Sequence, residues 1–146
     1  MRNKSVRRRT KLIIETFRLA KDNQVTLAKI AKTTRNEFNL TDGDKITYIK
    51  AIDNNNNILE VVNVSYEIKI KEEWVTILRY DSEHGFLHCH IRLSLSDVKE
   101  AVTTNNVIKK GTPHKWLTWA IDDIKANYLQ YRRGFMKRSK LIDIGY

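Results

Sequence analysis

The feature that most constrains the fold is a change in the spacing of apolar residues near the middle of the chain. From residue 62 to residue 70 every second side chain is apolar: Val62, Val64, Tyr66, Ile68 and Ile70. Successive side chains of a strand point to opposite faces, so this alternation is typical of an antiparallel strand with one buried face. Before residue 40 the apolar residues instead recur at helical spacing. The sequence therefore predicts an α+β fold in which helices precede a sheet.

The predicted elements follow from these two periods and from the turn residues between them. The N-terminal part contains two predicted helices, at residues 10–23 and 25–38, and a turn at 39–44 leads into the sheet. Four strands with short connections predict an antiparallel four-stranded β-meander, at residues 46–52, 62–70, 74–81 and 86–95. A short helix is expected at residues 97–103.

The last element is a long C-terminal amphipathic helix. Thr112-Pro113 suits an N-cap followed by proline in the first turn. Apolar residues then recur every three or four positions, at Leu117, Ile121, Ile124, Tyr128, Tyr131 and Phe135. We expect this stripe to pack on one face of the sheet.

The charge of the chain is unevenly distributed. The net charge is +10, and residues 1–40 contribute +8, with 11 Lys/Arg against 3 Asp/Glu. Residues 41–108 contribute −4 and residues 109–146 contribute +6. We therefore divide the chain into a basic N-terminal helical extension (1–40) and an α+β domain (41–146). Clustered positive charge favours binding to nucleic acid, and we expect RNA more than DNA.

The candidate nucleic-acid-binding residues are the arginines and lysines that cluster at the two ends of the chain, together with one in the sheet. They are Arg7, Arg8, Arg9, Arg92, Arg132, Arg133, Lys137 and Arg138. A single cysteine, Cys89, excludes an internal disulfide and fits a reducing compartment. No apolar run is long enough for a membrane span or a signal peptide, so we expect a cytoplasmic protein without a membrane partner.

The segment that could carry chemistry is the predicted hairpin at residues 74–95. If Asp81 faces Phe86 across a four-residue loop, Arg79 lies opposite His88. The alternation of side chains then places five polar residues on one face: Arg79, Asp81, His88, His90 and Arg92. Cys89 lies on the other, apolar face, which we expect to pack on the helices.

Two histidines, a carboxylate and two arginines suffice for metal-independent RNA cleavage. One imidazole, of His88 or His90, removes the proton of the 2′-hydroxyl, and the other donates a proton to the leaving 5′-oxygen. Arg79 and Arg92 contact the phosphate, and Asp81 orients a histidine. This hypothesis requires no cofactor and no metal.

Two other interpretations of the same residues stay open. The histidines can be ordinary residues of a polar outer sheet face. Alternatively, His88-x-His90 directs two imidazoles the same way, and His84 or Asp81 supplies a third ligand for a metal ion.

Residues 41–137 resemble the TumE-like toxins of toxin–antitoxin pairs. The resemblance rests on the Asp42-Gly43 turn, the Tyr66 strand, Arg79-Tyr80-Asp81, the downstream His88-x-His90 and the final helix. Ser82 departs from the asparagine that often follows the Arg-Tyr-Asp element. The resemblance implies a growth-inhibiting protein that acts on RNA and is neutralised by an antitoxin protein.

A second resemblance, at residues 35–46, is to AbrB-type DNA-binding antitoxins, in which a helix and a turn precede a Gly-Asp-Lys strand and two chains form a dimer. The sequence thus predicts a toxin-like ribonuclease. The alternative is a non-catalytic nucleic-acid-binding regulator, and a homodimer is compatible with either.

Overall fold

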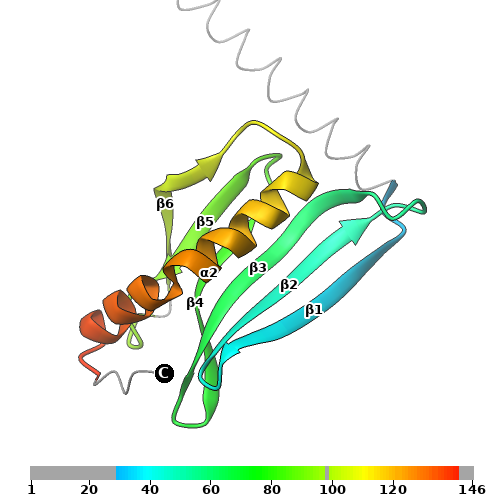
Figure 1. Ribbon diagram of the computed structural model, residues 1–146. Helices are drawn as coiled ribbons and strands as arrows, with labels where there is room; N and C mark the ends of the chain where they lie inside the picture. The colour runs from blue at the N-terminus through cyan, green and yellow to red at the C-terminus, as the bar shows by residue number, and fades with distance from the viewer. Residues whose placement is uncertain (1–28, 98, 142–146) are drawn as a thin grey trace, which may run out of the picture.

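A computed structural model describes residues 29–97 and 99–141 as one sheet and one helix (Figure 1). The sheet has six antiparallel strands in chain order, β1-β2-β3-β4-β5-β6. Their bounds are β1 Lys32–Thr41, β2 Asp44–Ile52, β3 Ile58–Ile70, β4 Glu73–Asp81, β5 Leu87–Arg92 and β6 Glu100–Ile108. The helix α2 spans Pro113–Arg138.

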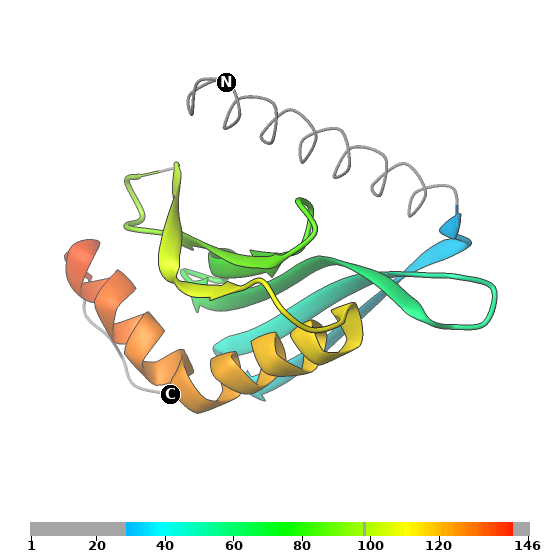
Figure 2. The same cartoon turned by 90° about the horizontal axis from the view of Figure 1, so that it is seen from above.

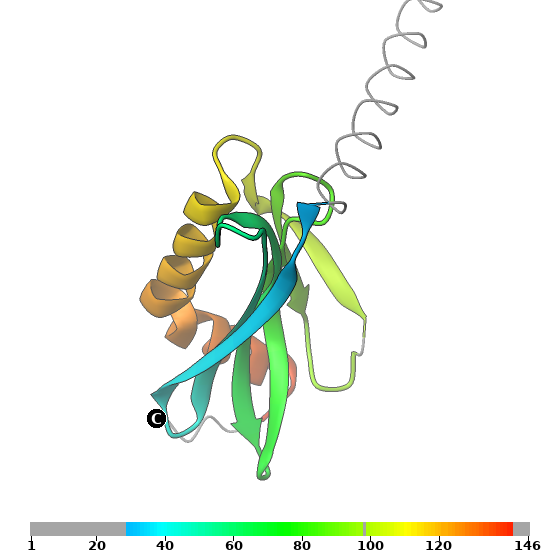
Figure 3. The ribbon, with the colours of Figure 1, turned by 90° about the vertical axis from the view of Figure 1, so that its right-hand side faces the viewer.

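The C-terminal helix confirms the prediction from its apolar stripe. The Thr112 side chain accepts from the Lys115 N–H, and Pro113 begins the helix. The helix packs on β3 and β4, and Figures 2 and 3 show it along one face of the sheet. The predicted stripe faces the core: Leu117, Ile124 and Phe135 are buried, and Ile121, Tyr128 and Tyr131 are half-buried against it.

A buried polar network ties α2 to the start of β2. Arg132, 2% exposed, places Nη1 2.9 Å from Oδ1 of the fully buried Asp44. The hydroxyl of Tyr66 donates to the same carboxylate oxygen at 2.6 Å, and Thr41 donates to the other oxygen. Burial and the Asp44 carboxylate raise the pKa of Tyr66, so its hydroxyl keeps its proton and acts as a donor. Charges buried in this way require close partners.

The predicted N-terminal helices and four-stranded meander are wrong where the structure describes them. The range 25–38 was expected to be helical, but Lys32–Thr41 is strand β1, paired along its length with β2. The helix expected at 10–23 lies outside the described residues. The short helix expected at 97–103 is replaced by β6, which pairs with β5.

Both errors have a physical cause. The segment at residues 100–108 is rich in Val, Thr and Ile, whose β-branched side chains favour strands. Residues 32–41 gain a partner strand through the two-residue Asp42-Gly43 connection, and tertiary pairing then overrides helical spacing. The sheet therefore begins at Lys32, and the predicted boundary at residue 41 cuts through its first strand. The helix that the AbrB-like resemblance requires is likewise a strand.

The face of the sheet opposite α2 is polar. Four residues that are paired in turn across strands β2 to β5 lie on this face: Thr47, Ser65, Arg79 and His90. We call it the polar face. No helix in the described ranges is long and apolar enough to cross a bilayer.

Candidate functional site

The β4–β5 hairpin places four of the predicted site residues side by side. Asp81 pairs with His88 and Arg79 pairs with His90. The predicted register is therefore wrong by two residues. Because side chains alternate with a period of two, a shift of two keeps every residue on its predicted face. The prediction that Cys89 lies on the other face is confirmed, since Cys89 pairs with Tyr80 and both are fully buried in the core.

Asp81 is the centre of a cluster that we define as Arg79, Asp81, His88, His90 and Glu100. Its carboxylate is 4% exposed and faces three basic groups. Oδ1 lies 2.6 Å from Nε2 of His88, while Oδ2 lies 2.6 Å from Nη1 of Arg79 and 3.1 Å from Nε2 of His90. The carboxylate of Glu100, on β6, accepts hydrogen bonds from Nε of Arg79 at 2.9–3.0 Å, and Nη2 of Arg79 lies 2.9 Å from its Oε2. The cluster thus joins three adjacent strands.

Both ring nitrogens of His88 have acceptors. Nε2 faces Asp81, and Nδ1 lies 3.2 Å from the carbonyl oxygen of Phe86. His90 is arranged differently: its Nδ1 lies 3.7 Å from Oε2 of Glu100. Its Nε2 is buried, and although Oδ2 of Asp81 is close, it makes no hydrogen bond with any residue that the structure describes. His90 therefore keeps an unsatisfied nitrogen that faces a carboxylate.

The electrostatics of the cluster favour a neutral His90. Burial is the main cause that lowers the pKa of His90, followed by the charge of Arg79, and the Asp81 and Glu100 carboxylates only partly offset it. Burial also acts to lower the pKa of Arg79, but hydrogen bonds and charge from Glu100 and Asp81 outweigh it and raise that pKa. Glu60 lies in the same field: burial, then the charges of Glu83 and Asp81, raise its pKa.

The cluster borders a pocket of about 440 Å³. Three imidazoles line it, together with an aromatic ring, a lysine and two residues of β6: His84, His88, His90, Phe86, Lys109, Thr103 and Val107. The His84 ring stacks on His88 with 5.5 Å between centroids, and Nζ of Lys109 lies 6.0 Å from the centroid of Phe86. The buried hydroxyl of Thr103 has no hydrogen-bond partner among the described residues. We call this hollow the histidine pocket.

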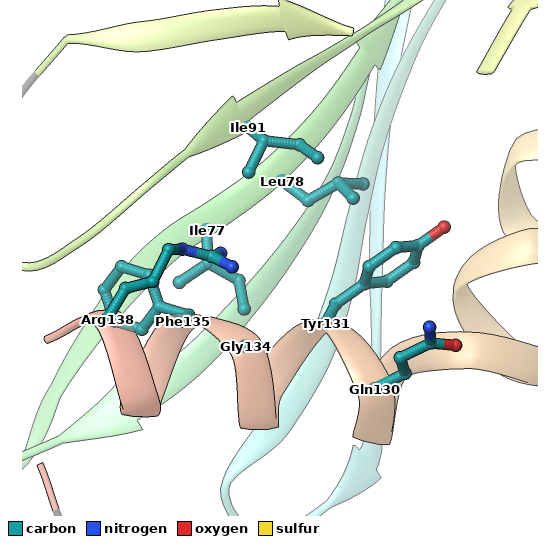
Figure 4. A pocket seen from close by; sticks show the side chains of 8 residues that line it. All are labelled: Ile77, Leu78, Ile91, Gln130, Tyr131, Gly134, Phe135 and Arg138. Atoms are coloured by element: carbon teal, nitrogen blue, oxygen red, sulfur yellow. The ribbon is translucent and has the colours of Figure 1, made fainter. Parts of the chain in front are cut away.

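A second pocket, of about 280 Å³, lies on the helix side of the sheet, between α2 and strands β4 and β5 (Figure 4). Its walls include Ile77, Leu78 and Ile91 from the sheet, and Tyr131 and Phe135 from α2. These walls present no group of histidines or carboxylates comparable with the Asp81 cluster. The candidate chemistry therefore lies at the histidine pocket.

The remaining predicted residues are not brought to this pocket. Arg92 donates from Nη2 to the Leu95 carbonyl at 2.7 Å and from Nε to the carbonyls of Ser94 and Asp97, so it holds the chain after β5. Arg132 is buried against Asp44. The other cations at the end of α2 are exposed, namely Arg133, Lys137 and Arg138, although Arg138 also donates to a backbone carbonyl. Arg7, Arg8 and Arg9 lie outside the described residues.

Sequence reasoning missed three residues of this site and gave a fourth, His84, a different role. Glu100 was missed because its segment was predicted to be helical, which removed it from the sheet. Phe86 and Lys109 gave no motif, since a lone aromatic residue or lysine beside a strand is common. His84 was considered only as a metal ligand. The available signal was that an aromatic residue, Phe86, and a basic residue, Lys109, flank the polar strands, which is typical of a ligand-binding pocket.

Comparison with known families decides the membership of the chain. The family model described as a domain of unknown function, DUF7718, matches residues 32–141. The chain belongs to the DUF7718 family. The matched range begins at the first residue of β1 and ends three residues after α2, so the DUF7718 domain includes the whole sheet and helix. No curated protein and no solved structure matches the chain.

Proposed function

We propose that this protein binds RNA at the histidine pocket and cleaves it. The observation that carries the proposal is the meeting of three imidazoles and a lysine around one hollow, beside a buried carboxylate. Imidazole is the side chain best suited to proton transfer near neutral pH, and cleavage of RNA requires one proton to leave the 2′-hydroxyl and one to reach the 5′-oxygen.

The lining of the pocket fits a nucleotide. The half-buried ring of Phe86 offers a surface on which a base can stack, and such stacking tolerates any base. Lys109 offers a positive charge for a phosphate beside that ring. The unpartnered hydroxyl of Thr103 can accept or donate one hydrogen bond to the same ligand.

The structure changes the roles proposed for the individual histidines. Both nitrogens of His88 face acceptors, so His88 serves best as a fixed part of the pocket wall. His84 is exposed, lines the pocket and stacks on His88. We therefore assign proton exchange with the substrate to His84, which takes the proton of the 2′-hydroxyl and returns it to the leaving 5′-oxygen, and we assign Arg79 and Asp81 to holding His88 and His90 in place.

The resemblance to TumE-like toxins supports the same proposal, because its motif residues Arg79, Asp81, His88 and His90 are those that meet in the cluster. On this proposal, expression of the chain arrests bacterial growth, and an antitoxin protein relieves the arrest. Whether RNA cleavage proceeds without a metal is a separate prediction of the sequence, and an EDTA arm of the assay tests it.

The test is cleavage of a mixed RNA pool by the full chain, by His84→Ala and by His114→Ala, each with and without EDTA. His114 is exposed near the start of α2, so it controls for the loss of a histidine elsewhere. We expect the wild type and His114→Ala to cut, and His84→Ala to lose at least about 100-fold of the rate, because His84 exchanges protons with the substrate. Equal cleavage by all three would exclude the pocket. RNA binding without cleavage would favour the non-catalytic regulator.

A further inference from the structure

We infer that Asp81, His88 and His90 form a binding site for a divalent transition-metal ion. One ligand atom from each residue, His Nε2 or a carboxylate oxygen, lies within 4.8 Å of the others. Nε2 of His88 lies 2.6 Å from Oδ1 of Asp81, and Nε2 of His90 lies 3.1 Å from Oδ2, the other oxygen of the same carboxylate. Donor atoms around a tetrahedral zinc ion lie about 3.4 Å apart, as follows from metal–ligand distances near 2.1 Å. Small side-chain movements therefore bring the three groups to coordination distance.

The outer contact of His88 has the arrangement that a metal ligand needs, and the outer contact of His90 approaches it. A ligating imidazole directs one nitrogen at the metal and its other N–H at a carbonyl or carboxylate. The Nδ1 of His88 faces the Phe86 carbonyl at 3.2 Å, and the Nδ1 of His90 faces Glu100 at 3.7 Å. If Nδ1 carries the proton in both rings, both Nε2 lone pairs point toward the Asp81 carboxylate. In that tautomer three lone-pair donors face one another, an arrangement that a bound cation would stabilise.

The unpartnered Nε2 of His90 is an independent sign of a ligand. This buried atom lies beside a carboxylate oxygen without forming a hydrogen bond to any described residue. An unsatisfied buried nitrogen is unfavourable, because it has lost its hydrogen bonds to water, and a metal ion would satisfy it.

The charge of the cluster points the same way. With neutral imidazoles it has one positive group, Arg79, and two negative groups, Asp81 and Glu100. Glu60 and Glu83 add to the negative field around Asp81. A divalent ion would reverse the sign of the cluster and make this wall of the pocket attractive to a phosphate.

The ligand set selects the type of ion. Two imidazoles and one carboxylate suit Zn²⁺ or Fe²⁺, whereas Mg²⁺ and Ca²⁺ require mainly oxygen ligands. Three protein ligands leave a coordination position open, as in catalytic zinc sites. His88 and His90 both line the histidine pocket, so that position would be accessible from it. The role of such an ion in RNA cleavage rests on the proposed function, but its binding does not.

The experiment measures metal binding alone. Metal-free full-length protein is titrated with Zn²⁺ by calorimetry and with Co²⁺ by visible absorption, using wild type, His88→Ala, His90→Ala and the control variants His84→Ala and His114→Ala. We expect one ion per chain in the wild type and in both controls. Loss of either ligand should weaken binding by more than about 100-fold, since even outer contacts matter by about 10–100-fold.

Because a buried variant can fail to fold, the same question is put to the wild type by NMR of the imidazole nitrogens. Zn²⁺ should shift the Nε2 resonances of His88 and His90 and leave those of His84 and His114 unchanged. Equal binding by all variants, no binding by the wild type, or zinc-induced shifts confined to His84 or His114 would each overturn the inference. RNA cleavage that persists in EDTA would contradict a catalytic role of the ion but not the site itself.

Discussion

The sharpest stability prediction concerns Arg132, which the sequence assigned to nucleic-acid binding and the structure buries. The substitution Arg132→Met keeps the length of the apolar stem and removes the charge. The fully buried Asp44 carboxylate then keeps two of the side-chain donors described above, the hydroxyls of Tyr66 and Thr41. Removal of one partner of a buried ion pair costs about 3–5 kcal/mol, because the other charge is left uncompensated.

Two neutral donors still reach the carboxylate, so we expect the low end of that range, about 3 kcal/mol. For a domain of this size that loss lowers the melting temperature by on the order of 10–20 °C. Urea unfolding followed by tryptophan fluorescence gives the free energy of unfolding of wild type, Arg132→Met and Arg133→Met. Arg133 is exposed and adjacent, and its substitution should change stability by less than about 0.5 kcal/mol.

A double-mutant cycle with Asp44→Asn separates the pair from its surroundings. The double variant should lose at least about 1 kcal/mol less than the sum of the two single losses, since it leaves no unpaired charge. A loss below about 1 kcal/mol for Arg132→Met alone, typical of a surface ion pair, would refute the reasoning.

Three further predictions concern a lysine, a glycine and a turn. Lys109→Ala should lower the slope of log affinity for single-stranded RNA against log salt by about 0.7, whereas Lys110→Ala should not; equal slopes would place the phosphate elsewhere. Gly111→Ala should destabilise the domain by more than about 1 kcal/mol in urea unfolding, because Gly111 has φ +111°; an unchanged midpoint would contradict this. The backbone N–H of Asn57 is the main cause that lowers the pKa of Asp53 below its usual 3.8. The turn should therefore keep this contact above pH 4 and lose it as the pH falls through the lowered value. A carboxyl titration by NMR that gives 3.8 or more would exclude this.

The sequence was sufficient to predict the elements whose own pattern decides their structure. Each of the four predicted strands is present as β2 to β5, because apolar alternation and short turns leave few alternatives, but the sheet has six strands and the predicted four-stranded meander is wrong. The final helix was confirmed because the N-cap at Thr112, Pro113 and the stripe from Leu117 to Phe135 all agree. Agreement between local signals of this kind is what makes an element predictable.

The first strand was not predicted because its apolar residues also fit a helix. The signal that could have corrected this was Asp42-Gly43, a strong hairpin dipeptide between two segments that can alternate. In the structure Thr41 pairs with Asp44 across this turn. If the turn is instead interpreted as the end of a helix, strand β1 is not predicted, and the sheet then lacks its first edge strand.

The sequence predicted which residues of β4 and β5 form the site better than it predicted how they are paired and spaced. The period of two places Arg79, Asp81, His88 and His90 on one face for any register shift of an even number of residues, and the register error was two. The distances could not be predicted, because the loop from Ser82 to Leu87 fixes them. Glu100 depends on the pairing of β6 with β5: the β-branched residues of 100–108 favour a strand, but they do not indicate which strand it pairs with.

The most direct test of the central claim is to locate RNA on the protein. A short, non-cleavable RNA oligonucleotide is titrated into ¹⁵N-labelled protein, and backbone amide shifts are followed residue by residue. The account predicts that the largest shifts cluster at Phe86, His88, Thr103 and Lys109. Shifts confined to the exposed basic end of α2, at Arg133 and Lys137, would contradict it.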